Sequence, residues 1–237
     1  MKRFLFFLLF ALTASVADAQ SPVGTWSVTP RVGVSLAKLS GDEIAMSAGG
    51  ANVSKSQYRA GFTGGADVMY QVSRGVGLSL GVSFTQRGTD YKNCEYQSSS
   101  APITYTAFHD SYQRMSDIDV PLMAHLYLAT GLSVGVGLQA SFLVDDKFHY
   151  EIQSYVFDPE TGARQWEPNT EGDYDLKHAM HMARFSVPVG LSYEYQQVVL
   201  EACYAFPLSK VYKKKDYGND DVRNRCFTVT VGYKFDL

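Results

Sequence analysis

The sequence contains only three cysteines in 237 residues, Cys94, Cys203 and Cys226. They form no Cys-x-x-Cys pair, which excludes a zinc ribbon or a thioredoxin-like redox motif. The chain also has no glycine-rich phosphate loop and no nucleophile elbow, the sharp strand-to-helix turn that presents a catalytic serine. We therefore expect no catalytic residues, no cofactor and no metal site.

Positive charge is also scarce. Lysine and arginine number 21 against 24 acidic residues, for a net charge of −3. Removing the two cations and one anion of the first twenty residues takes this to −4. A nucleic-acid-binding domain would show a basic stripe, so we expect no nucleic-acid partner.

Long apolar runs are missing except near the start. Phe4–Leu12 follows two cations and precedes the pattern Ala17-Asp18-Ala19. It is too short to span a bilayer, and this order of features is that of a secretory signal peptide. We expect residues 1–19 to be a signal peptide cleaved near Ala19/Gln20, and residues 20–237 to form one outer-membrane domain.

What the chain does have is alternation. In Arg225–Leu237 the apolar residues all fall on one parity, and the other parity is small or polar. A period of two predicts a strand with two different faces. Seven earlier stretches repeat the pattern: 26–36, 58–71, 76–85, 117–128, 132–142, 183–194 and 198–208.

The connections between these stretches alternate in length. Those after the second, fourth and sixth have two to four residues, and the others are much longer. The longest insertion, 147–177, is expected to carry its own hairpin, because Asp158–Gly162 is a strong turn signal. Short periplasmic turns and long extracellular loops are typical of an outer-membrane barrel. The sequence predicts an all-β fold, an eight-stranded antiparallel up-and-down transmembrane β-barrel.

The second parity is mostly Gly, Ser, Thr and Ala with a few charges. It would make a poor solvated surface but fits a narrow interior, since eight strands leave room only for side chains. We therefore expect the apolar parity to face lipid. A soluble periplasmic carrier of the lipocalin type would require the reverse arrangement.

Charges inside a narrow barrel should pair. We hypothesise two lumenal ion-pair clusters that plug the barrel, the alternative being that several of these residues lie at the rims in water. The candidates are Arg87, Arg184, Asp117 and Asp119 in the outer half and Arg31, Lys234, Asp67, Glu194 and Glu201 in the periplasmic half.

Cys203 and Cys226 fall on the polar parity of adjacent strands. A hairpin centred near Lys214 and Lys215 would bring them almost opposite each other. Export permits a disulfide here, and two small buried side chains are the alternative. Cys94 lies in an expected loop without an evident partner.

Other reactive groups give weaker signals. Asp175, His178 and His181 are spaced by three at a loop-to-strand boundary, where that spacing does not align side chains. His125 lies on the lumenal parity among serines, a pattern too common here to indicate a Ser-His pair. Lys213–Lys215 is either a solvated loop or a contact for anionic lipid headgroups.

Four segments together resemble the PorT-like outer-membrane β-barrel family: Pro30–Val34, Asp117–Leu122, Phe185–Gly190 and the terminal Val231–Phe235. The resemblance covers essentially the whole mature chain. It implies an eight-stranded barrel with no shared catalytic residues, and some members serve protein secretion. The chain ends Phe-Asp-Leu rather than on an aromatic residue, although Leu237 keeps the apolar parity.

We therefore expect a non-enzymatic outer-membrane barrel that acts through its surface loops or its periplasmic rim. The expected partners are outer-membrane lipid, the barrel-assembly machinery, and an extracellular or secretion-system protein. Three alternatives stay open: a lipid-modifying barrel enzyme, a component of a secretion machinery, and a soluble periplasmic carrier.

Overall fold

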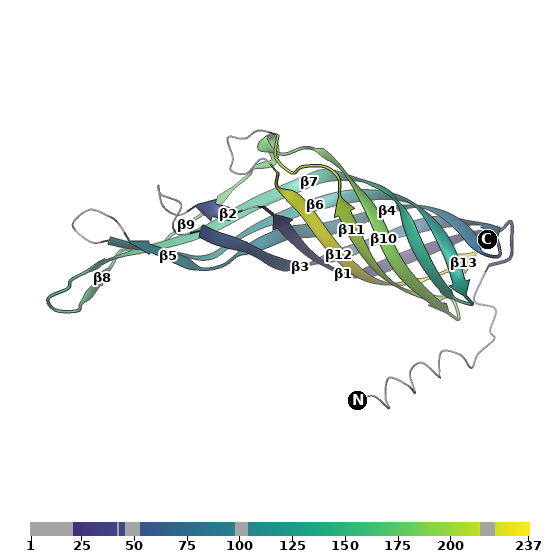
Figure 1. Cartoon of the computed structure of the whole chain (residues 1–237), viewed down its shortest axis with the longest axis horizontal. Helices are drawn as coiled ribbons and strands as arrows, with labels where there is room; N and C mark the ends of the chain where they lie inside the picture. Colours follow the sequence, from purple (N-terminus) through teal and green to yellow (C-terminus); the bar gives the residue numbers. More distant parts are fainter. Residues whose placement is uncertain (1–20, 42, 46–52, 98–103, 214–220) are drawn as a thin grey trace, which may run out of the picture.

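The computed structural model describes residues 21–41, 43–45, 53–97, 104–213 and 221–237; the expected signal peptide lies outside them. Their strands form one antiparallel sheet that closes into a barrel (Figure 1). The eight strands of the ring are, in order, β1 (Trp26–Ser40), β3 (Val53–Ser73), β4 (Val76–Tyr91), β6 (Thr104–Ala129), β7 (Leu132–Phe157), β10 (Ala183–Tyr195), β11 (Val198–Pro207) and β12 (Arg223–Tyr233). Because β12 pairs back with β1, the predicted eight-stranded barrel is confirmed. No helix among the described residues is long and apolar enough to cross a membrane.

Three tight turns lie at the end of the barrel that holds the C-terminus (Figure 1). They are Arg74-Gly75, Thr130-Gly131 and Gln196-Gln197. Gln196 and Gln197 have φ of 46° and 71°, the left-handed conformation that a two-residue hairpin of type I′ requires. Nearby, β13 (Phe235–Asp236) extends the pairing of the C-terminus with β1. Short turns mark this as the periplasmic end.

At the other end β6 and β7 continue far beyond their neighbours, with 26 residues each (Figure 1). A strand crosses a membrane in about 9–11 residues, so more than half of each lies outside it. Short strands pair with this extension: β5 (Cys94–Gln97) with β6, and β8 (Arg164–Trp166) and β9 (Thr170–Tyr174) with β7. We call residues 94–97, 104–113 and 147–174 the extracellular arm. Another short strand, β2 (Glu43–Ala45), pairs with β3.

The arm corrects the sequence prediction in part: residues 92–113 were expected to be a polar connection, and the insertion 147–177 was expected to carry a separate hairpin rather than to continue the barrel strands. Residues 104–113 and 147–157 are strands. Both faces of the arm are outside the bilayer, so it has no apolar-polar alternation to detect. The expected hairpin turn is present, because the strands flanking Asp158–Gly162 pair with each other.

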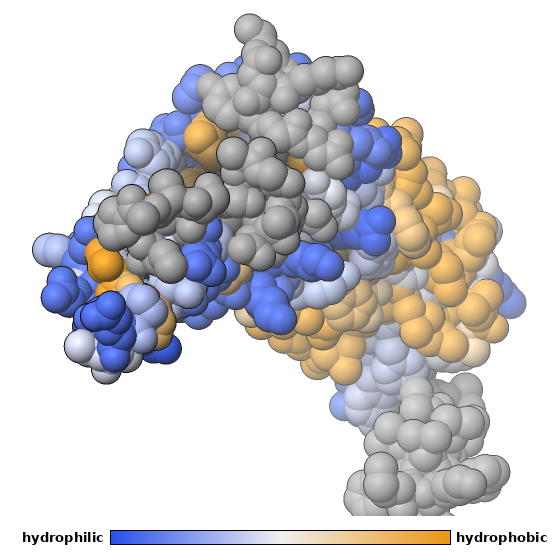
Figure 2. Space-filling view, turned by 60° about the vertical axis from the view of Figure 1, so that its left-hand side comes forward, coloured by the Kyte–Doolittle hydropathy of each residue, from blue (hydrophilic) through white to orange (hydrophobic). Residues whose placement is uncertain are grey.

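The apolar parity faces outward on the barrel. Val32, Leu80 and Leu138 are all more than half exposed, whereas the alternate residues Ser79 and Ser133 are buried. On the face drawn in Figure 2, apolar surface covers the barrel and polar surface lies beyond it, as part of an apolar belt. At the periplasmic rim of the belt the rings of Trp26 and Tyr70 lie 4.8 Å apart. This arrangement is the reverse of a soluble carrier's.

An apolar plug, which the sequence analysis missed, closes the extracellular mouth of the barrel. Three of its residues stand on the inward parity of strands, and four come from the segments before β10 and between β11 and β12. The seven are Leu39, Met115, Leu143, Met180, Val211, Tyr212 and Val222. The short 3₁₀ helix η1 (Lys177–Ala179) leads into Met180, which bridges to Tyr212. The sequence signal that could have indicated the plug was the presence of apolar side chains on the inward-facing parity near the ends of strands.

Candidate functional site

The outer half of the lumen holds a buried ion-pair cluster directly below the plug. Arg87 donates to Asp117 at 3.0 Å and to Asp119 at 2.7 Å. Arg184 donates to the second oxygen of Asp117. Ser141 accepts from Arg87 and donates to Asp119 at 2.6 Å. The four candidate residues of the outer half therefore form one connected network.

The periplasmic half contains two separate groups. Arg31 lies between Asp67 and Glu201, with its bond to Glu201 at 2.9 Å. Lys234 donates to both oxygens of Glu194 at 2.9 Å and is only 1% exposed. The five candidates of this half therefore pair inside the barrel, in two groups rather than one.

Between the outer cluster and Arg31 lies a cavity of about 80 Å³. It has room for a few water molecules and is far smaller than ordinary ligand pockets of about 300–1,000 Å³. Salt bridges on either side of the cavity and the apolar plug fill the described lumen. The barrel interior thus acts as a packed core rather than as a channel.

A serine and a histidine meet in this lumen. Ser79 lies 2.8 Å from Nε2 of His125, and both are buried. Gly77–Gly81 has the letters Gly-x-Ser-x-Gly, but it lies within the regular strand β4 instead of a strand-to-helix turn. The adjoining cavity is too small for an acyl substrate.

Among the residues that the structure describes, no group of three His, Cys, Asp or Glu could hold a metal ion.

Cys203 and Cys226 are both buried, and both are free thiols. Cys203 lies opposite Thr228, and Cys226 lies opposite Ala205. The two cysteines, expected almost opposite each other, are therefore two residues out of direct opposition. The register depends on the loop between β11 and β12, whose residues 214–220 lie outside the described part of the chain. Cys94 is in strand β5, not in a loop.

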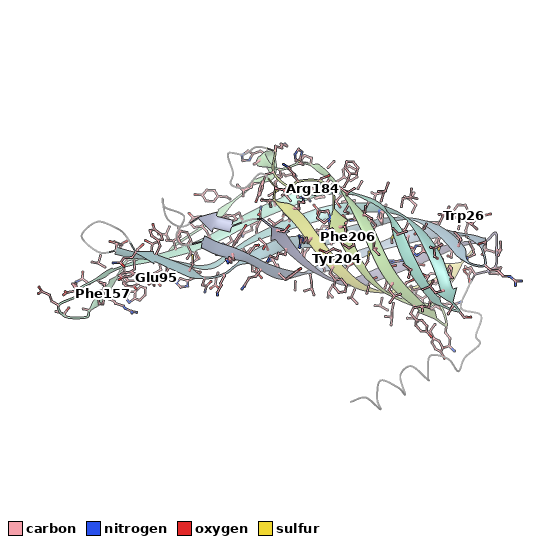
Figure 3. All side chains as sticks on the ribbon, viewed as in Figure 1. Trp26, Glu95, Phe157, Arg184, Tyr204 and Phe206 are labelled. Atoms are coloured by element: carbon pink, nitrogen blue, oxygen red, sulfur yellow. The ribbon has the colours of Figure 1, made fainter. Side chains whose placement is uncertain are left out.

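One face of the extracellular arm carries a cluster of aromatic side chains around Tyr155. Its ring stacks on Tyr105 at 4.9 Å and contacts Trp166 at 4.6 Å. The guanidinium of Arg164 lies over the same ring at 5.2 Å. The hydroxyl of Tyr155 donates to Glu95 at 3.1 Å. These five residues, together with Phe157 beside Tyr105, form what we call the aromatic face of the arm. Figure 3 places Glu95 and Phe157 on this arm, far from Arg184 in the barrel.

Register explains why these residues share a face. Tyr155 lies directly opposite Tyr105 on one side and Trp166 on the other. Directly opposed residues of antiparallel strands point to the same side of the sheet. Trp166 is 52% exposed, so the cluster reaches solvent.

A family model described as outer membrane protein beta-barrel domain matches residues 17–213, most of the chain. The chain belongs to this outer-membrane β-barrel family. Its membership agrees with the exposed apolar belt and the closed ring of strands, and it places the protein in the outer membrane. No curated protein matches the chain.

The outer-membrane barrel is also similar to solved structures. Ail, the attachment invasion locus protein of Yersinia pestis, is 14% identical, with 90% of this chain and 100% of that chain covered and a TM-score of 0.41. Neisserial surface protein A is 15% identical, with 89% and 97% covered and a TM-score of 0.41. The outer membrane protease OmpT from Escherichia coli is 12% identical, with 95% and 100% covered and a TM-score of 0.38. At these values the likenesses carry no inference about function.

In this outer-membrane protein, the plug is tied to the base of the arm by a buried carboxyl above the lipid belt. Asp146 accepts hydrogen bonds from Gln113 at 3.0 Å and from the backbone of Leu176 at 3.1 Å. Gln113 in turn accepts from the hydroxyl of Tyr212. Burial raises the pKa of Asp146 to about 6, although the two hydrogen bonds act in the opposite direction.

Proposed function

We propose that this outer-membrane barrel is a non-enzymatic binding protein that holds a protein partner on the aromatic face of its extracellular arm. The observation that carries the proposal is the setting of Tyr155. It is held by Tyr105, Trp166, Arg164 and Glu95 on a sheet that projects from the barrel. The packed lumen adds support, because it leaves the surface as the part of the protein available for binding.

The chemistry of the aromatic face suits a protein partner. Tryptophan, tyrosine and arginine are the residue types most often found at binding hot spots. Side chains already fixed by stacking lose little conformational entropy on association, which favours affinity. Because the arm is built of paired strands, it also holds these side chains on a more rigid base than an irregular loop would.

The resemblance to the PorT-like family supports a finer proposal, that the partner belongs to a protein-secretion machinery. A partner on another cell or in the medium is the second candidate. The two candidates share the same surface. They differ in whether the captured protein comes from the same cell envelope.

Site-specific photo-cross-linking in intact cells tests the proposal. The photoreactive residue is placed at Trp166, and the matched control is Gln165, the adjacent exposed residue on the opposite face of β8. We expect one discrete cross-linked protein from Trp166 and none from Gln165. The cross-linked band is excised and identified, and this decides between the two partner candidates.

A second experiment asks whether the contact depends on the cluster. With the photoreactive residue moved to Tyr105, the substitution Arg164→Ala should reduce the cross-linked yield several-fold, while heat-modifiable gel migration of the barrel stays unchanged. Equal yields from the two faces, or a yield insensitive to Arg164→Ala, would contradict the proposal. An acyl-release assay on wild type and His125→Ala checks the alternative of a lipid-modifying enzyme, and we expect no activity from either.

A further inference from the structure

Two cations face each other on the outside of the barrel near its extracellular rim. Lys38 of β1 and Arg225 of β12 are direct partners in the register of the two strands. Both share the parity of the outward residues Leu36 and Val229. Like charges directly opposite on neighbouring strands destabilise a sheet. An anion bound between the two cations would remove this repulsion.

Elsewhere on the chain the anion is supplied internally. Arg114 and Lys147 are also directly opposed, on β6 and β7. Arg114 has Asp145 at 4.0 Å, and Lys147 has Asp173 at 2.8 Å. This pair shows how the protein neutralises opposed cations when it uses its own carboxylates.

Lys38 and Arg225 have no such carboxylate among the residues that the structure describes. The acid in the adjacent loop, Asp221, accepts from both Nε and Nη2 of Arg223 at 3.1 Å. Lys38 contacts the ring of Tyr58 at 5.9 Å, which leaves its charge uncompensated. Within the described part of the chain, neither Lys38 nor Arg225 is therefore neutralised by a carboxylate.

The height of the two cations relative to the lipid belt indicates which anion is available. Ten residues separate Trp26, at the periplasmic rim, from Leu36. At about 3.4 Å per residue and a tilt of 35–45°, this covers about 25 Å, the height of the apolar band of an outer-membrane barrel. Lys38 is the next outward position above Leu36. It therefore lies at the level of the headgroups of the outer leaflet.

Beside Arg225 an open groove of about 630 Å³ runs along the ends of β11 and β12. Tyr204 and Phe206 line it, with ring centroids 4.6 Å apart, and Figure 3 shows both on this side of the barrel. Phe206 is 51% exposed, and Arg223 and Arg225 stand at the same groove. Asp221 also lines the groove, and it is paired with Arg223. The groove thus combines an aromatic surface, which suits acyl chains, with Arg225 as a cationic donor for a headgroup.

We propose that Lys38 and Arg225 together bind the phosphate of an outer-leaflet lipid, whose acyl chains lie against Tyr204 and Phe206. The ammonium and guanidinium groups donate to phosphate oxygens, a charge-assisted pairing that is stronger than one between neutral groups. The phosphate replaces the missing carboxylate and removes the repulsion between the two cations. The lipid site lies on β1, β11 and β12, separate from the aromatic face of the arm.

The test uses the refolded full-length protein in micelles of an uncharged, sugar-headed detergent that contains no phosphate, alone or with the phosphorylated glycolipid lipid A. The test variant is Lys38→Gln/Arg225→Gln, and the matched control is Arg114→Gln/Lys147→Gln. We expect lipid A to raise the unfolding temperature of wild type and control but not of the test variant. In the phosphate-free detergent alone the test variant should be at least as stable as wild type, because the repulsion between the two cations is relieved.

Native mass spectrometry gives a second readout that does not depend on stability. The amount of lipid A retained should fall at least about tenfold in the test variant, because even one lost charge-assisted hydrogen bond corresponds to that factor, and it should change little in the control. Lipid A without its phosphates should neither stabilise wild type nor be retained. Equal responses of wild type and test variant, or an equal effect of the dephosphorylated lipid, would overturn the proposal.

Discussion

Arg184 donates a hydrogen bond to Asp117 across an intervening strand, since β10 and β6 are both neighbours of β7 but not of each other. Arg87 of β4 occupies the other oxygen of the same carboxylate. Asp117 therefore links three strands through the interior of the barrel. Backbone hydrogen bonds join only adjacent strands, so this ion pair adds a connection that the ladder itself cannot make.

Replacing Arg184 with Met should lower the stability of the barrel. Asp117 is fully buried, and loss of one partner leaves its charge poorly compensated, which costs roughly 3–5 kcal/mol for a buried pair. The readout is the midpoint temperature of heat-modifiable gel migration. Arg164→Met, on the exposed arm, is the control and should leave the midpoint unchanged. An unchanged midpoint for Arg184→Met would show that the network does not stabilise the fold.

Gly33→Ala should also destabilise the barrel. A Cβ at Gly33 would lie 2.0 Å from the carbonyl oxygen of Val229 and 2.7 Å from Cα of Thr230, so the backbone of β12 must move. We expect a loss of roughly 1–3 kcal/mol. Gly75→Ala in a periplasmic turn is the matched control, because nothing lies within 4 Å of its Cβ position. Urea titration of both variants provides the comparison, and equal stabilities would argue against the close approach of β1 and β12.

The three cysteines should all react as thiols. Cys203 and Cys226 are free and two residues out of direct opposition, and a disulfide requires short, well-oriented Cβ separations. Protein unfolded without reductant should therefore take up one maleimide on each of the three cysteines, as counted by intact mass. A mass with a single adduct would reveal a bridge and contradict the free pair.

Lowering the pH should stabilise the closed conformation of the plug. The pKa of Asp146 is raised from 3.8 to about 6 in the fold, so its carboxyl stabilises the closed plug below about pH 4, and this stabilisation is lost as the pH rises through 6. Asp145 and Asp175 also face this carboxyl and favour its neutral form. Between pH 7.5 and pH 5 we expect about tenfold more protection of the Leu176 amide, or about 1.4 kcal/mol.

Hydrogen exchange of the Leu176 amide, corrected for its intrinsic pH dependence, measures this effect. Asp146→Asn removes the titrating group and should make protection independent of pH across the same range. Persistence of the pH dependence in Asp146→Asn would assign it to another group.

Particular residues show which features of the fold could be predicted from the sequence. Alternation identified Val32 and Leu80 as outward and Ser79 and Ser133 as inward, since the two faces of a membrane barrel differ sharply in chemistry. It also assigned Arg184 and Asp117 to the interior. It did not identify the pairing of Arg184 with a strand two positions away. That contact depends on barrel curvature, which no local pattern encodes.

The alternation of apolar and polar residues did not predict the arm or the plug, for two different reasons. Tyr105 and Tyr155 lie on strands with water on both sides, so their backbone pairing leaves no apolar-polar signal. Leu39, Leu143 and Met180 meet from distant parts of the chain, and each alone reads as an isolated apolar residue.

From residue order alone came the number of strands, their up-and-down order and the side of each strand that touches lipid; the export signal stays a prediction of the sequence. These properties are local, because hydrocarbon selects one parity of each strand independently. Folding in three dimensions settled which lumenal charges pair, what closes the extracellular mouth, and that Tyr105, Tyr155 and Trp166 form one surface. Those outcomes depend on register and closure, which bring together side chains that the chain itself holds far apart.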